Sequence, residues 1–179
     1  MRKIFITAGH RGEGTGASGI IDEGAEAILL RDSIAKELAQ RGCTVLTDSD
    51  RDDLGKVIRK INAGAAPTDI CVDIHFNASG GAAHGTEVLH RMRPTDTEIQ
   101  LAEDILHATT ATLGTKNRGV KRESAGQHSR LAMLSGVKCN SVLVEVCFCD
   151  SPGDCAKYTA GRDALIKAYA DVLERHAKA

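Results

Sequence analysis

Short apolar runs alternate with longer amphipathic segments along the whole chain. Apolar residues spaced three and four apart predict helices, and the short runs bounded by glycine and polar residues predict strands. The predicted strands are residues 3–7, 43–47, 70–74, 85–91 and 141–147, and the predicted helices are residues 23–41, 53–63, 97–113 and 162–176. This alternation predicts an α/β fold, a three-layer α/β/α sandwich around a mainly parallel, mixed and twisted sheet of about six strands. No linker or internal repeat interrupts the pattern, so we expect residues 1–179 to form a single domain.

Residues 115–130 follow neither a helical nor a strand period. The segment is rich in basic residues and carries Glu123 as its acidic residue. We therefore predict a basic surface loop. Two interpretations remain open for it: a solvated loop, or a rim that binds an anionic group of a substrate.

Composition narrows the possible partners. The chain has 179 residues, 42% hydrophobic and 26% charged, a globular balance for one core. Its 23 lysines and arginines against 24 aspartates and glutamates give a net charge of −1, which argues against nucleic acid or an anionic membrane as a partner. The absence of tryptophan and the few other aromatic residues leave little surface for stacking on bases or sugars.

The chain start and the cysteines bear on the compartment. The apolar run before Gly9 is too short for a signal peptide, and no apolar stretch reaches the roughly 18 residues of a membrane span. We therefore expect synthesis in the cytoplasm without a signal peptide, and no membrane insertion. Six cysteines without CxxC pairs favour reduced core thiols, with a disulfide set as the alternative.

Glu145 lies in the most apolar predicted strand, between Val144 and Val146. An ionised carboxylate inside such a strand destabilises the fold by several kcal/mol unless it is paired or binds a metal. The strand itself offers no cation, so Glu145 indicates a metal site or a buried base. The alternative is a glutamate that reaches solvent or a distant arginine.

Two histidines follow predicted strands. His10 comes after the first strand and His75 after the third, and the carboxyl ends of parallel strands share one edge of a sheet. The strand period also places Asp73 on the same face as His75, although direct bonding along one strand is not assured. With a carboxylate from the start of the next helix, the set becomes His/His/Glu with an open position, as in hydrolytic zinc sites. Alone, each histidine is a weak signal, and His75 by itself is more typical of a structural histidine than of a metal ligand.

Three motifs carry a resemblance to a known family. They are ITAGH at residues 6–10, ICVDIHFN at residues 70–77 and SVLVEVCF at residues 141–148. In order and spacing they resemble the zinc-dependent N-acetylmuramoyl-L-alanine amidases of amidase family 3, over nearly the whole chain. The chain departs from that family at two places. After His10 it has residues 11–13, Arg-Gly-Glu, where the family has a glycine-rich stretch that contains an aspartate, and it has Asp73 where the family usually has serine.

The resemblance implies roles for individual residues. It makes His10 and His75 ligands of Zn²⁺ and Glu145 the catalytic carboxylate. The third ligand is a glutamate near the start of the first helix, and the distances to Leu38 and Gly42 favour Glu23 over Glu26. Asn77, Gln127, His128 and Arg130 are predicted substrate contacts, and for the three loop residues this prediction comes from their position in the sequence and not from the resemblance.

The implied reaction is hydrolysis of the amide between N-acetylmuramic acid and L-alanine in peptidoglycan. An isolated catalytic domain resembles a phage endolysin, and a recycling amidase or an exported toxin are alternatives. A zinc peptidase or deacylase on another amide, and a peptidoglycan-binding module without catalysis, also remain open. We expect the chain to be a monomer.

Overall fold

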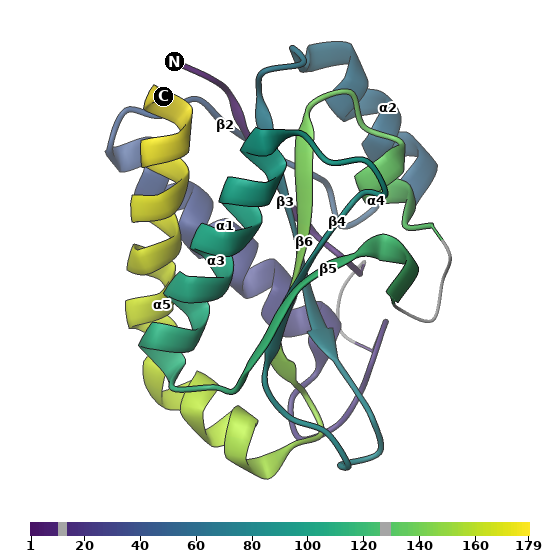
Figure 1. The fold of residues 1–179 in the computed structure, drawn as a ribbon, viewed down its shortest axis with the longest axis vertical. Helices are drawn as coiled ribbons and strands as arrows, with labels where there is room; N and C mark the ends of the chain where they lie inside the picture. The colour runs from purple at the N-terminus through teal and green to yellow at the C-terminus, as the bar shows by residue number, and fades with distance from the viewer. Residues whose placement is uncertain (11–13, 126–129) are drawn as a thin grey trace.

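Six strands form one sheet in the computed structural model, which describes residues 1–10, 14–125 and 130–179 (Figure 1). Along the sheet the order is β2-β1-β3-β6-β4-β5. All neighbouring strands are parallel except β4 and β6, which are antiparallel. The strands are β1 (Ile4–Ala8), β2 (Val45–Thr47), β3 (Ile70–Asn77), β4 (Thr86–His90), β5 (Asn117–Arg122) and β6 (Asn140–Phe148). The predicted mainly parallel, mixed sheet is confirmed.

Helices cover both faces of this sheet, unequally (Figure 1). One face carries three long helices, α1 (Glu23–Gln40), α3 (Asp96–Leu113) and α5 (Pro152–Lys178). The other carries two shorter ones, α2 (Leu54–Gly64) and α4 (Ala132–Ser135), and a 3₁₀ turn (Glu123–Ala125) follows β5. The three-layer α/β/α sandwich is therefore confirmed.

The alternation of side chains along β3 shows how the two faces differ. Ile70, Val72 and Ile74 point into the large core beneath the long helices. Cys71 points the other way, into a small core beside α2 and α4. Asp73 and His75 share that second face, because residues two apart along a strand project to the same side. Polar chemistry thus concentrates on the sparsely covered face of the sheet.

Two predicted boundaries were wrong. Helix α5 begins at Pro152 rather than at residue 162, with Ser151 as its N-cap. Gly161, just before the predicted start, lies inside the helix where it passes α3, and a Cβ there would approach Leu113 Cδ2 to 2.7 Å. Residues 115–130 are not simply a loop, since β5 occupies the first half of the segment.

The cysteines and the helix lengths agree with the sequence. All six cysteines are free and buried, as predicted for reduced core thiols. Within the described ranges, no helix combines the length and hydropathy that crossing a bilayer requires.

Candidate active site

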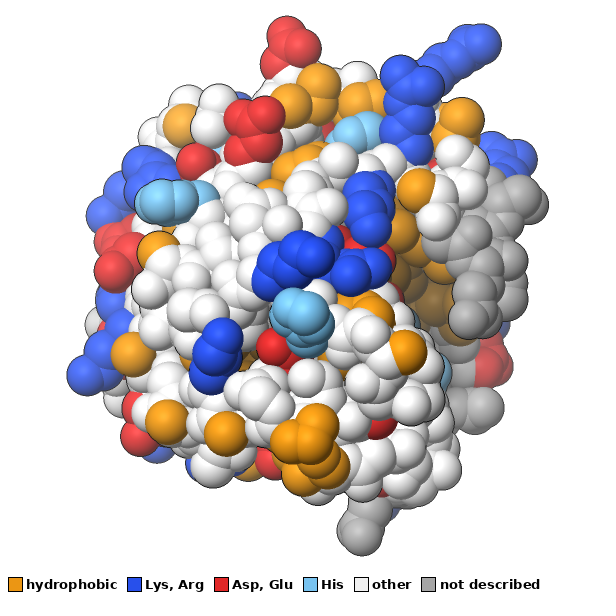
Figure 2. All heavy atoms as spheres, turned by 60° about the horizontal axis from the view of Figure 1, so that its bottom comes forward, with side chains coloured by type: hydrophobic (Ala, Val, Ile, Leu, Met, Phe, Trp, Pro, Cys, Tyr) orange, Lys and Arg blue, Asp and Glu red, His pale blue; other side chains and the backbone are white. Residues whose placement is uncertain are grey.

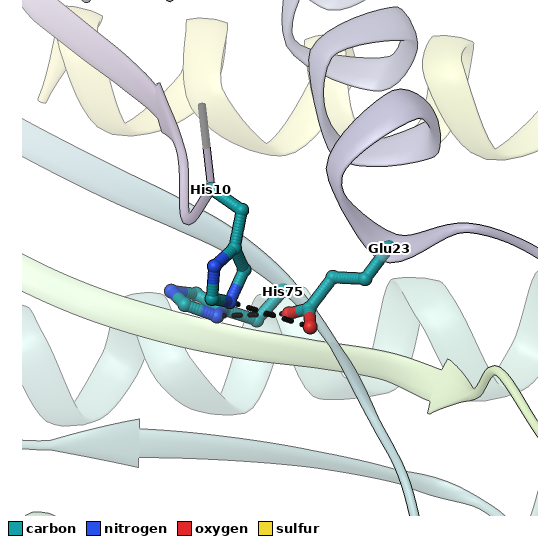
Figure 3. Close-up of side chains that lie close together, drawn as sticks. All are labelled: His10, Glu23 and His75. Carbon is teal, nitrogen blue, oxygen red and sulfur yellow. Dashed lines mark hydrogen bonds and ion pairs between the residues drawn. The ribbon is translucent and has the colours of Figure 1, made fainter. Parts of the chain in front are cut away.

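Three side chains from separate parts of the chain meet at the carboxyl edge of β1 and β3. His10 follows β1, His75 lies in β3, and Glu23 is the first residue of α1. Glu23 Oε2 lies 3.3 Å from His10 Nε2, and Glu23 Oε1 lies 3.1 Å from His75 Nδ1. Figure 3 shows both imidazoles pointing toward the same carboxylate. We call these three residues the metal end of the site.

The sheet register and two glycines bring the metal end together. Parallel pairing sets Ala8 opposite Ile74, so the chain just beyond β1 passes beside His75. A Cβ at Gly9 would lie 2.1 Å from the His75 ring, and a Cβ at Gly16 would lie 2.5 Å from His10 Cδ2. Gly16 also has φ +82°, a conformation that side chains disfavour. Both positions therefore require glycine.

Glu23 is ionised and firmly held. It is 3% exposed, and its carboxylate accepts hydrogen bonds from the backbone N–H groups of Ala17 (2.6 Å) and Phe76 (3.1 Å). Burial alone would raise the pKa of Glu23, but the hydrogen bonds from His10, His75 and Ala17 outweigh it, so the pKa is lowered. The N-cap Asp22, which accepts from the Ala25 N–H at 2.9 Å, fixes where the helix begins and hence where Glu23 points.

Asp73 supports His75 from behind. Asp73 Oδ2 lies 3.1 Å from His75 Nε2, and Asp73 Oδ1 accepts a hydrogen bond from Thr7 Oγ1 at 2.6 Å. The two residues therefore bond directly, which the sequence alone left open. A carboxylate that accepts the Nε2 proton leaves Nδ1 as the nitrogen that can ligate a metal. Burial opposes protonation of His75, but Asp73 and Glu23 outweigh it and raise its pKa, so metal binding must displace a proton from the ring.

Glu145 stands next to the metal end, in the central strand β6. The sheet register pairs it with His75 of β3 on one side and Glu87 of β4 on the other. Its Oε2 is buried and has no hydrogen-bond partner among the described residues. Burial, reinforced by Glu23 and Glu87 against an opposing effect of His75, raises the pKa of Glu145 to about 7. A carboxylate with one buried oxygen that accepts no hydrogen bond can accept a proton from a substrate or water, as a general base must.

A groove leads from the metal end past Glu145. Leu89, Leu131 and Leu143 line part of it, and Asn77 and Glu87 line its wall. Figure 2 shows lysine and arginine side chains gathered beside a hollow with hydrophobic side chains on its wall. The groove thus joins a polar reacting centre to an amphipathic binding surface.

The remaining predicted residues have four different outcomes. Glu26, the alternative to Glu23, turns away from the metal end and accepts a hydrogen bond from Tyr158 Oη at 2.8 Å. Asn77 lines the groove, and its Nδ2 lies 3.3 Å from Glu87 Oε1. Gln127 and His128 lie outside the described residues. Arg130 is exposed and is not among the described residues that line the groove.

Sequence reasoning missed Glu87 as a site residue. It is 8% exposed on β4 and pairs with Arg118 Nε and Lys121 Nζ, each at 2.6 Å. The available signal was the same one that identified Glu145, a carboxylate inside a short apolar strand that needs a compensating charge.

The donor set of the metal end fits a divalent ion. One donor atom from each of His10, Glu23 and His75 lies within 4.8 Å of the other two. Ligand atoms about 2.0–2.2 Å from a tetrahedral zinc ion are roughly 3.3 Å apart. The Glu23–histidine separations of 3.3 and 3.1 Å are of this size, with His10 beside Oε2 and His75 beside Oε1 of the carboxylate. Two imidazoles and one carboxylate are also a common donor set of catalytic zinc sites. Their role as ligands stays a prediction.

Comparisons with known proteins find similar sequences and structures among cell-wall amidases. The family model described as N-acetylmuramoyl-L-alanine amidase matches residues 4–175. An uncharacterized Clostridium perfringens protein is 31% identical to this chain, over 96% of this chain and 51% of its own length. The Bacillus subtilis N-acetylmuramoyl-L-alanine amidase LytC is 29% identical, over 86% of this chain and 31% of its own length. A solved structure, the catalytic domain of the CD27L endolysin targeting Clostridia Difficile, superposes with a TM-score of 0.80 at 26% identity, with 98% of each chain covered. The chain spans about half the length of the Clostridium perfringens relatives it matches.

Proposed function

Because the chain belongs to the N-acetylmuramoyl-L-alanine amidase family, we propose that it hydrolyses the amide between N-acetylmuramic acid and L-alanine in peptidoglycan, with zinc held by His10, Glu23 and His75. The observation that carries the proposal is the vacant, buried Oε2 of Glu145 beside this donor set. A base and a metal site within one groove are what amide hydrolysis by activated water requires.

Each residue has a defined task in this reaction. Zinc, when bound, polarises the amide carbonyl and makes water a stronger nucleophile near neutral pH. Glu145 accepts the proton of the attacking water and passes it to the departing nitrogen of L-alanine. Asp73 holds the His75 ring in the orientation that ligation needs. The apolar groove wall reduces access of bulk water to Glu145, which keeps its pKa high enough to act as both base and acid.

We further propose a role in lysis of the bacterial wall, as a phage endolysin. The likeness to the CD27L endolysin catalytic domain, which extends over 98% of both chains, supports this setting. A recycling amidase and an exported toxin are the competing settings.

Digestion of purified peptidoglycan tests the reaction. The expected products are peptides with new L-alanine amino-termini and glycan strands that remain intact, with activity lost on chelation and restored by Zn²⁺. Peptides cut at internal bonds would instead support a zinc peptidase. Binding to sacculi without any release of peptide, even when Zn²⁺ is added to the assay, would support a non-catalytic binding module and contradict the proposal.

A further inference from the structure

A second charged cluster lies beyond Glu145, away from the metal end. Glu87 on β4 receives two cations from β5 on the same oxygen, Oε2. Arg118 reaches it through Nε, while its guanidinium packs over the Phe148 ring at 4.9 Å. Lys121 reaches it through Nζ. We call Glu87, Arg118 and Lys121 the basic end of the site.

A β-bulge brings the two cations to one side of the sheet. Thr86 pairs with Asn117 and Val88 with Val120, so β5 advances three residues while β4 advances two. The extra residue coincides with Gly119, whose φ is +91°. Without the bulge, Arg118 and Lys121 would project to opposite faces, because they are an odd number of residues apart. The bulge therefore directs both side chains at Glu87.

The basic end carries an excess positive charge. Two permanent cations surround one carboxylate, whose pKa is lowered because Lys121 and Arg118 outweigh its burial. Among the described residues, the Lys121 ammonium bonds to Glu87 alone, which engages one of its three N–H donors. The Arg118 and Lys121 side chains are 27% and 30% exposed, so they are accessible to a ligand.

The reaction chemistry sets the direction in which the leaving peptide extends. Across the sheet the register runs from His75 to Glu145 to Glu87. Since Glu145 returns a proton to the departing nitrogen, that nitrogen lies on the Glu145 side of the metal end. The peptide beyond it then continues toward β4 and β5.

The distances suit a carboxylate close to the scissile bond. Strands are about 4.8 Å apart, so β5 lies roughly 10 Å from β6, and the long side chains of Arg118 and Lys121 reach back as far as Glu87 on β4. Two residues of extended peptide span up to about 7 Å. A carboxylate on the second residue of the leaving peptide is thus within reach of the basic end.

We propose that Arg118 and Lys121, positioned by Glu87 and the Gly119 bulge, bind a free carboxylate on the second residue of the stem peptide and so select substrates that carry it. The inference rests on the proposed function. Charge-assisted hydrogen bonds to a carboxylate supply the selectivity, and an amide in its place offers no negative charge.

Two soluble substrates test the proposal. Both are disaccharide tripeptides linked through the muramoyl lactyl group to L-alanine, and they differ in the second residue, which carries either a free α-carboxylate or an α-carboxamide. We expect the zinc-loaded wild-type chain to hydrolyse the carboxylate form with a kcat/KM about tenfold higher. Arg118→Gln and Lys121→Gln should each reduce that ratio toward one. Because the ratio is measured within one variant, differences in folded fraction cancel.

Arg122→Gln is the matched control. Arg122 carries the same charge on the same strand but is exposed and projects to the opposite face from Lys121, so its substitution should leave the ratio unchanged. Equal hydrolysis of both substrates by the wild type, or a ratio that persists in both variants, would overturn the inference while leaving the amidase function standing. If the wild-type chain hydrolysed neither soluble substrate and also released no peptide from purified sacculi, the proposed amidase function itself would be wrong.

Discussion

The metal end and the basic end of the groove are charge clusters with opposite imbalances. At the metal end, the acids Glu23 and Asp73 surround His75, with no lysine or arginine among the groove-lining residues described there. At the basic end, Arg118 and Lys121 share Glu87. Between them, Glu145 has an oxygen without a partner. The acidic surroundings of His75 favour binding of a cation at the metal end, and the two cations around Glu87 favour binding of an anion at the basic end. Glu145, which lies between the two ends, is placed to accept a proton.

The two ends also differ in how they are built. The metal end gathers side chains from the segment after β1, from β3 and from α1, which are far apart in sequence, with glycines permitting the close approach. The basic end is made from two adjacent strands and a bulge. The predictions below act on one end at a time, so that loss of metal can be separated from loss of base and of substrate contacts.

The largest effect should come from removing a metal ligand. His75→Ala and Glu23→Ala are expected to lose bound zinc and, with it, essentially all hydrolysis, because each supplies one of three converging donors. Metal analysis after dialysis, paired with a peptidoglycan-release assay, measures both. Glu26→Ala is the matched control and should retain zinc, since Glu26 contacts Tyr158 instead. Zinc retained in Glu23→Ala but lost from Glu26→Ala would reverse the assignment.

Glu145→Gln should separate the base from the ligands. Hydrolysis is expected to fall by about 10²–10⁴-fold while zinc content stays at the wild-type level, because a positioned base contributes on that order and Glu145 is not in the donor set. Single-turnover rates with equal metal loading make the comparison. Loss of zinc in this variant would show that Glu145 is a ligand.

Gly16→Ala should loosen the metal end without removing a ligand. The added methyl group would overlap His10 Cδ2 and Glu23 Oε2 at 2.5–2.6 Å, in a backbone conformation unfavourable for alanine. Weaker zinc binding by about 10–100-fold is expected, as for other changes that disturb ligand support. Competition with a chelator of known affinity measures it. Gly14→Ala, also at positive φ but with no described residue within 4 Å of its Cβ, controls for backbone strain.

The pH profile should report the group in the middle of the groove. Glu145 acts as a base only when ionised, and burial raises its pKa to about 7. Activity should therefore fall as pH decreases, with a midpoint at or below 7 because a cation at the metal end favours the ionised form. One pH unit below that midpoint, kcat/KM should be about tenfold under its plateau. The residual activity of Glu145→Gln should lack this limb, and a wild-type rate that rises on acidification would contradict the assignment.

The pattern of apolar and polar residues was enough to predict most of the secondary structure and one residue of the site. Apolar periodicity located the sheet and most helices, and the apolar neighbours of Glu145 indicated that its carboxylate would be largely shielded from solvent, as its buried Oε2 is. Glu23 and Glu26 could not be separated with certainty, because residues three apart lie on nearly one face of a helix. What distinguishes them is tertiary: Glu23, at the helix start, faces the sheet edge, and Glu26 faces α5.

The sequence predicted only part of the basic end: a rim that binds an anionic group was one of two interpretations of residues 115–130, but strand β5 and its pairing with Glu87 were missed. Strand β5 has no alternating pattern because the bulge at Gly119 shifts its period, and so residues 115–130 were interpreted as a loop. The partnership of Arg118 and Lys121 with Glu87 depends on strand pairing, which no local pattern contains.

The unequal helical cover of the sheet has a consequence for how this protein can change. Its large apolar core lies beneath α1, α3 and α5, whereas the groove opens on the face that carries the short helices α2 and α4. Mutations that reshape the groove rim therefore touch little of what keeps the chain folded. Such a layout suits directed evolution, in which new peptide preferences could be selected at exposed positions of the rim while the large core beneath the long helices keeps its sequence.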